Sequence, residues 1–299
     1  MKSDRRDPLA TSAEDEIAAK VEEAKALHSQ EAPAFRVGSS RVFFACLVLL
    51  GGSYLLLIAL LILADVGYLV FSGDAVEALA ESLRSPDVRY AIVLSLVSCS
   101  LTTILALWVA VPIGYLMSRF EFRGKAWVDT LLDIPIVLPP LVVGISLLIL
   151  FNFLPESLSR FVVFEVPAVV LAQFTVACVF AVRTMRVTFD QIPRRFEDVA
   201  LTLGCSPRQA FWLVVMPQAR TGLLAAATLA WARSLGEFGP ILVFAGATPQ
   251  RTEVLPTTVF LEMQSGDLPG MLAVSIIMIV LAAVVLVLAR LLGLRRINA

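Results

Sequence analysis

The stretch FEDVALTLGCSPRQAFWLVVMP runs from Phe196 to Pro217, between two segments that are almost entirely apolar. It carries charges, helix-capping residues and two prolines, so it does not read as part of a membrane span. We predict that it forms a separate module within a loop over residues 189–220. The fold class follows from asking why such a module lies between two apolar segments.

The module has the helix-starting and helix-ending residues of two short helices joined by a tight turn. Pro193 suits a first helical position, and Gly204 suits the left-handed residue that ends a helix, so the first helix is predicted over 193–203. Ser206 and Gln209 then have the pattern of a capping box. The second helix is predicted to stop before Pro217.

The composition predicts an all-α polytopic membrane protein. Of 299 residues 58% are hydrophobic and only 16% are charged, whereas soluble domains carry about 25% charged residues. A membrane helix needs roughly 20 apolar residues. Six such stretches are predicted as spans, at about 42–64, 90–118, 127–153, 167–188, 221–245 and 269–292.

The third span contains DIPIVLPPLVVG, Asp133–Gly144, and is predicted to be kinked or broken at its prolines. Broken membrane helices are tolerated where protein or a water-filled path satisfies the backbone. A kink that only serves packing and a break that lines a translocation path both remain open.

The distribution of basic residues predicts that both termini are cytoplasmic. Under the positive-inside rule the arginine- and lysine-rich flanks face the cytoplasm. With the N-terminus inside, four arginines would lie outside (Arg84, Arg89, Arg160 and Arg251) and fourteen basic residues inside. The Phe196–Pro217 module is then cytoplasmic as well.

Two domains are predicted, a polar cytoplasmic tail over residues 1–35 and a transmembrane domain over 36–299. This chain has few of the residues that catalytic sites use. It has one histidine and four cysteines without paired spacing, so we expect no metal site and no catalytic residues. No GxxxxGK[ST] loop occurs, and we expect no bound cofactor and no nucleic-acid partner.

A loop with this many helix-capping and helix-ending residues indicates a docking element more than a passive surface loop. Its residues resemble the cytoplasmic signature of binding-protein-dependent ABC importer permeases, EAA, three residues, G, nine residues, I-x-LP. Asp198-Val199-Ala200 stands at EAA, Gly204 at the glycine, Val214 at the isoleucine and Met216-Pro217 at LP. The resemblance extends over roughly residues 88–292.

The resemblance implies a type I importer permease with a cytoplasmic coupling helix pair, in a prokaryotic inner membrane. It implies that ATP is hydrolysed by a separate ATPase subunit, present in two copies, and that an extracytoplasmic solute-binding protein delivers the substrate. The chain would act as a homodimer or pair with a similar subunit. The implied ATPase-coupling residues are Glu197, Asp198, Ala200, Gly204 and Pro217.

Two stretches, Asp133–Gly144 and Trp231–Gly246, resemble molybdate and tungstate permeases, with sulfate and thiosulfate permeases close behind. The implied substrate is a tetrahedral oxyanion, with phosphate or ferric ion as alternatives. Arg233 and Glu237 lie one helical turn apart inside a predicted span, where ionisable residues are costly. An ion pair that fixes packing and a role in an anion path both remain open. The candidate path or gate residues are Pro139, Pro140, Arg233 and Glu237.

A secondary transporter acting alone is the competing class. It would need a dedicated intramembrane site with several buried carboxylates or inverted repeats. Beyond Arg233 and Glu237 the spans contain little of this kind.

Overall fold

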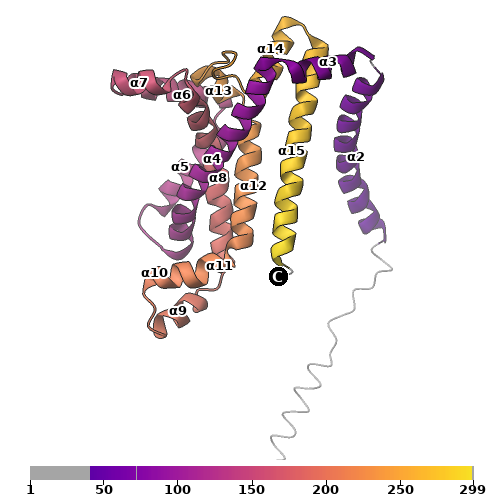
Figure 1. The fold of residues 1–299 in the computed structure, drawn as a ribbon. Helices are drawn as coiled ribbons and strands as arrows, with labels where there is room; N and C mark the ends of the chain where they lie inside the picture. Colours follow the sequence, from indigo (N-terminus) through magenta and orange to yellow (C-terminus); the bar gives the residue numbers. More distant parts are fainter. Residues whose placement is uncertain (1–40, 72, 298–299) are drawn as a thin grey trace, which may run out of the picture. The chain divides into compact units, whose positions relative to one another are not determined.

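The computed structural model describes residues 41–71 and 73–297, and within them every regular element is a helix (Figure 1). The predicted tail, residues 1–35, lies outside the described residues, so the tail and the domain boundary after it stay predictions. The chain divides into two compact units between Ile62 and Leu63, within α2 (Arg41–Phe71). From residue 43 to 62 the side chains of α2 are exposed, and in a bilayer such a surface must be covered by lipid or by other protein.

The second unit contains the remaining helices. They are α3 (Gly73–Arg84), α4 (Pro86–Arg119), α5 (Lys125–Val137), α6 (Pro140–Asn152), α7 (Glu156–Val162), α8 (Val166–Asp190), α9 (Arg195–Thr202), α10 (Pro207–Ala210), the π-helical segment η2 (Phe211–Val215), α11 (Met216–Gln218), α12 (Arg220–Leu235), α13 (Gly239–Phe244), α14 (Leu255–Ser265) and α15 (Leu268–Ile297).

The centre of this unit is the pair α4 and α8, with α12 packed on both (Figure 1). Small residues make the close approach possible. Ala106 and Ala110 on α4, and Ala177 and Ala181 on α8, are fully buried in one cluster. Each pair is four residues apart and so lies on one helical face. Small residues at such faces let membrane helices come together, because helix association in lipid depends on close packing.

Among the described residues four helices are long and apolar enough to cross a bilayer, and two bent helix pairs raise the number to six if each pair is one span. The predicted third span is confirmed as broken: α5 and α6 meet at an angle of 113° around Pro139. The predicted fifth span, 221–245, is interrupted as well. α12 ends at Leu235, and α13 starts again at Gly239.

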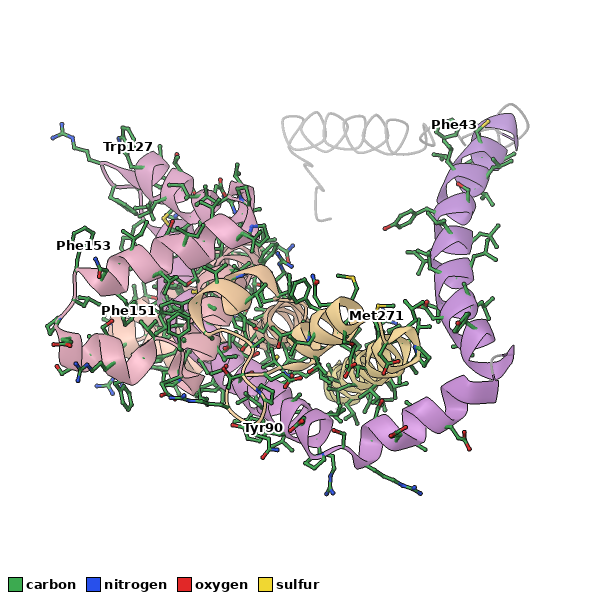
Figure 2. All side chains as sticks on the ribbon, turned by 90° about the horizontal axis from the view of Figure 1, so that it is seen from above. Phe43, Tyr90, Trp127, Phe151, Phe153 and Met271 are labelled. Carbon is green, nitrogen blue, oxygen red and sulfur yellow. The ribbon has the colours of Figure 1, made fainter. Side chains whose placement is uncertain are left out.

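Aromatic side chains of this unit lie both in its core and on its outer surface. Phe151 packs against Phe244 in the core, with ring centroids 5.2 Å apart. Phe153 and Trp127 are 81% and 80% exposed and lie at the outer edge of the unit (Figure 2). Aromatic rings on the outer surface suit the membrane–water interface, where they are enriched.

Replacing Gly114 by valine is expected to destabilise the α4–α8 pair. A Cβ atom at this position would lie 2.9 Å from the Cβ of Met185 and 2.9 Å from the backbone nitrogen of Arg186, so the helices must separate. Thermal unfolding of the detergent-solubilised protein would then begin several degrees lower. Gly67→Val is the control, since a Cβ there has no neighbour within 4 Å. Equal melting temperatures for the two variants would contradict this account of the packing.

Candidate functional site

The predicted cytoplasmic module forms a compact group of short helices at one end of α4 and α8 (Figure 1). We call residues 195–218, comprising α9, α10, η2 and α11, the coupling element. Its first helix packs on η2 and on α10, and Ala200 and Ala210 are buried between them. The two-helix arrangement predicted from the sequence is confirmed.

The turn between the two helices follows the predicted local chemistry. Gly204 has φ +88°, the left-handed conformation that costs glycine nothing but crowds other residues. The N–H of Cys205 donates to the carbonyl of Ala200, which closes the end of α9. Ser206 and Gln209 form the predicted capping box, with the Ser206 N–H 2.8 Å from Oε1 of Gln209.

Two predicted helix ends are wrong. α9 begins at Arg195 and not at Pro193, because the Pro193 carbonyl accepts from the N–H of Phe196 in a turn that precedes the helix. The second helix does not stop before Pro217. It widens into η2, continues through α11 and bends by 71° into α12. Pro217 lies in the first turn of α11, where a missing N–H is tolerated.

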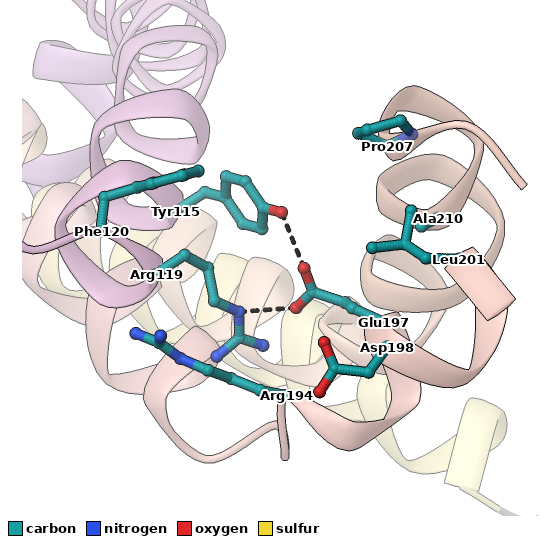
Figure 3. A pocket seen from close by; sticks show the side chains of 9 residues that line it. All are labelled: Tyr115, Arg119, Phe120, Arg194, Glu197, Asp198, Leu201, Pro207 and Ala210. Carbon is teal, nitrogen blue, oxygen red and sulfur yellow. Dashed lines mark hydrogen bonds and ion pairs between the residues drawn. The ribbon is translucent and has the colours of Figure 1, made fainter.

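Arg119, the last residue of α4, holds the coupling element to the ends of the central helices (Figure 3). Its side chain is buried, and its Nε donates to Oε1 of Glu197 at 2.6 Å. Nη1 and Nη2 donate to the carbonyls of Phe189 and Ile192, at 3.0 and 2.9 Å. One guanidinium therefore joins α4, the end of α8 and the first turn of α9.

Tyr115, one turn earlier on α4, strengthens the same connection. Its hydroxyl donates to Oε2 of Glu197 at 2.8 Å, so both carboxylate oxygens of Glu197 are bound (Figure 3). Its ring lies edge-on to Phe211 of η2, with centroids 4.8 Å apart, and to Phe189 at 5.6 Å. Both helices of the coupling element are thus tied to α4.

A pocket of about 240 Å³ opens beside this network, between the end of α4 and the coupling element. Its polar side carries Arg119, Arg194, Glu197 and Asp198, of which Arg194 also donates to the Ser118 carbonyl at 2.9 Å. Glu197 and Asp198, adjacent in the sequence, therefore lie in different surroundings. Glu197 is fixed within the chain, whereas Asp198 is exposed.

The outer surface of the coupling element is apolar. Leu203 is 80% exposed and Leu213 is 67% exposed. Exposed apolar groups collected on one protruding element indicate an interaction surface. The exposed apolar side chains of this surface are Phe196, Val199, Leu201, Leu203, Trp212 and Leu213.

The candidate path residues lie away from the coupling element, at the two breaks in the spans. A Cβ on Gly239 would come within 2.8 Å of the Cβ of Pro140, and one on Gly144 within 3.0 Å of the Pro240 carbonyl oxygen. The break in the third span therefore packs directly against the start of α13. Pro139 and Pro140 themselves are exposed.

Arg233 and Glu237 lie beside the second break and form the predicted pair. The Arg233 Nη2 is 3.1 Å from Oε1 of Glu237, whose side chain is only 2% exposed. That oxygen is within ion-pair distance but accepts no hydrogen bond from the described residues. The guanidinium instead lies over the Phe180 ring, 5.4 Å from its centroid. The roles predicted for these residues and for the coupling residues stay predictions.

Sequence reasoning missed Arg119 and Tyr115 as members of the site. Arg119 stood only among the basic residues that set topology. Its partner Glu197 is 78 residues away, so no local spacing joins the two. An arginine at the end of a span, one turn after a tyrosine, is the only sequence signal, and it is a weak one.

A family model described as "Binding-protein-dependent transport system inner membrane component" matches residues 110–298. The sulfate transport system permease protein CysT of Escherichia coli (strain K12) is 31% identical over 262 residues, 85% of this chain and 94% of its own length. The molybdate/tungstate transport system permease protein WtpB of Thermococcus kodakarensis is 36% identical over 180 residues, 60% of this chain and 70% of its own.

A probable molybdenum ABC transporter permease protein of Haloferax volcanii is 34% identical over 237 residues, 77% of this chain and 85% of its own. Among solved structures, a bacterial ABC transporter involved in alginate import aligns with a TM-score of 0.68. It covers 88% of this chain and 98% of its own, at 15% identity, and so supports the fold alone.

Replacing Arg119 by methionine is expected to loosen the coupling element without unfolding the spans. Methionine fills similar space but leaves Oε1 of Glu197 and two carbonyls without their donor, and removing one partner of a buried ion pair costs about 3–5 kcal/mol. Amide hydrogen exchange over residues 195–218 should accelerate at least tenfold. A tenfold change corresponds to about 1.4 kcal/mol, a modest fraction of that cost.

Arg208→Met, at an exposed position on α10, is the control and should leave the exchange unchanged. Wild-type exchange rates in Arg119→Met would show that the guanidinium does not hold the element in place.

Proposed function

Because this chain belongs to the family of binding-protein-dependent transport system inner membrane components, the permeases of ABC importers, we propose that it forms the translocation path for a tetrahedral oxyanion. It is a multi-pass inner membrane protein and a transport subunit, not an enzyme. Molybdate or tungstate is the favoured cargo, and sulfate or thiosulfate the second candidate.

The coupling element is the observation that carries this proposal. It presents exposed apolar side chains, and a buried network fixes it to the ends of α4 and α8. An element with an apolar outer face and a rigidly held inner face suits a site that binds a partner and transmits the partner's movement to the spans. The partner proposed here is an ATPase subunit, with two copies serving two permease chains.

The chain itself is proposed to bind no cofactor, with ATP used by the partner. A binding protein is proposed to deliver the substrate, since one solved relative in fold is an alginate transporter in complex with a periplasmic binding protein. The two permease positions are proposed to be filled by two copies of this chain, or by this chain and a similar one. The outer surface of α2 offers apolar area for such an assembly.

The oxyanion class is supported by the names of several relatives. Molybdate/tungstate and molybdenum permeases give 33–36% identity over part of the chain, whereas sulfate permeases give 30–31% over longer alignments. The family match argues against a secondary transporter acting alone, which would need no coupling element. Phosphate and ferric ion stay alternatives, because a binding protein can set selectivity before the substrate reaches this chain.

Gly204→Val and Asp198→Lys are each expected to uncouple ATP hydrolysis from uptake while leaving the protein inserted. Valine at φ +88° is strained by about 1–2 kcal/mol in its backbone alone, since nothing lies within 4 Å of the new Cβ. Lysine at 198 places a third cation beside Arg119 and Arg194. Uptake into proteoliposomes should fall at least tenfold. The ATPase activity stimulated by the binding protein is measured in the same proteoliposomes.

Gly266→Val is the matched control. Gly266 also has a positive φ, +81°, with no atom near the new Cβ, but it lies at the far end of the unit from the coupling element. It should keep the ratio of uptake to ATP hydrolysed. Full coupling in both Gly204→Val and Asp198→Lys would exclude the proposed docking role.

The cargo is tested with the binding protein loaded with one anion at a time. Molybdate or tungstate should stimulate ATPase activity of the reconstituted complex more than sulfate, thiosulfate or phosphate does. The unloaded binding protein serves as the baseline. Stimulation only by a ferric, sugar or amino-acid load would reject the oxyanion and leave the importer assignment intact.

A further inference from the structure

Arginines in the spanning segments differ in how many of their N–H donors are already used. Arg119 is 6% exposed at its side chain, and all three of its nitrogens donate to protein acceptors. A guanidinium has five N–H donors in a fixed fork. Arg119 therefore has little capacity left for a ligand, and its role is structural.

Arg233 differs in this respect. Its side chain is 38% exposed, and among the described residues it has an ion-pair contact with Glu237 but no side-chain hydrogen bond. Its guanidinium rests on the face of Phe180, which attracts the cation without using its N–H donors. Most of the donor fork is thus available.

Arg183 is also incompletely used. It follows Phe180 by three residues on α8, about 4.5 Å further toward the end that carries the coupling element. It donates to Asp133 of α5, its one hydrogen bond within the described residues. The two side chains are 44% and 46% exposed, so both can be reached from outside the packed core.

We propose that Arg233 of α12, beside Phe180 of α8, and Arg183 of α8 are two successive oxyanion-binding stations, and that Asp133 competes with the passing anion for Arg183. This rests on the proposed oxyanion cargo. Planar guanidinium forks match the oxygen pairs of tetrahedral oxyanions. Because each arginine has a carboxylate partner, the anion is held weakly enough to leave, as conduction requires.

The position of α5 makes the second station adjustable. None of its residues is buried, and the break at Pro139 separates its direction from that of α6 by 113°. Ion pairs to α8 therefore contribute to holding α5 in place, beside the packing of Leu132 on the core. A displacement of α5 would carry Asp133 away from Arg183 and so change the affinity of that station.

A neighbouring ion pair provides an internal comparison. Arg186 donates to Asp129 of α5 and also lies 4.0 Å from Asp190, so two carboxylates surround it. Its side chain is 28% exposed, less than that of Arg183. This pair joins the same two helices, yet its surplus negative charge disfavours an anion. It is assigned a structural role only.

The test compares two double variants in the complete reconstituted complex with its ATPase subunits and binding protein. Arg183→Gln/Asp133→Asn removes the station, and Arg186→Gln/Asp129→Asn removes the neighbouring pair. Each change keeps hydrogen-bonding groups while removing both charges. Uptake of radiolabelled molybdate and sulfate is measured together with ATP hydrolysed per anion.

The first variant is expected to lose at least about tenfold of its maximal uptake rate, the loss of roughly one charge-assisted hydrogen bond, with ATPase stimulation retained. The second is expected to stay within about threefold of wild type, because this pair is assigned no contact with the anion and a partly exposed ion pair contributes little to stability. Equal uptake in both variants, whether both are normal or both reduced, would overturn the station at Arg183.

If the first variant does not assemble, the Arg183→Lys variant tests the station at Arg183 instead. It keeps the charge but loses the planar fork, so maximal uptake should fall several-fold while ATPase stimulation persists. An unchanged uptake rate would overturn the proposal. Failure of the proposed cargo gives a different result, since wild-type complex would then import neither radiolabelled anion.

Discussion

The buried charge of Arg119 is the constraint on which the arrangement at the ends of α4 and α8 depends. An unpaired guanidinium in such a place would cost several kcal/mol. The chain meets this requirement with the carbonyls that end α8 and with the carboxylate that begins α9. Satisfying one charge therefore dictates where three segments meet. The coupling element is consequently a continuation of the central helices and does not behave as a loose loop.

This fixed end contrasts with the other elements near the breaks. α5 buries none of its residues, and α12 leaves the coupling element at a bend of 71°. A force applied to the coupling element would pass directly to α4 and α8, because hydrogen bonds to buried groups resist distortion. Relative movement would then concentrate at the bend before α12 and at the packing of α5 on α8. The break at Pro139 suits such movement of α5, since few backbone bonds cross it.

Local chemistry made part of this structure predictable. Apolar length located the spans, and Gly204 with Ser206 and Gln209 located the turn, because each signal acts within a few residues. Pro217 misled the prediction, since a proline ends a helix only where its N–H is needed, and at the start of α11 it is not. The pairing of Arg119 with Glu197 depends on packing between helices far apart in sequence, which no single-sequence pattern encodes.

Under the proposed oxyanion path, exposure and donor use separate a structural arginine from the arginines that would meet the anion. Arg119, Arg183 and Arg233 are the same residue in the same kind of segment, and composition cannot distinguish them. Their exposure and the number of donors already used do distinguish them. A path that carries a dianion needs positive groups that are accessible yet compensated, because an uncompensated arginine in a low-dielectric setting would retain the anion. Compensation by Asp133 and Glu237 meets this need without a deep site, which is compatible with selection of the substrate outside the membrane.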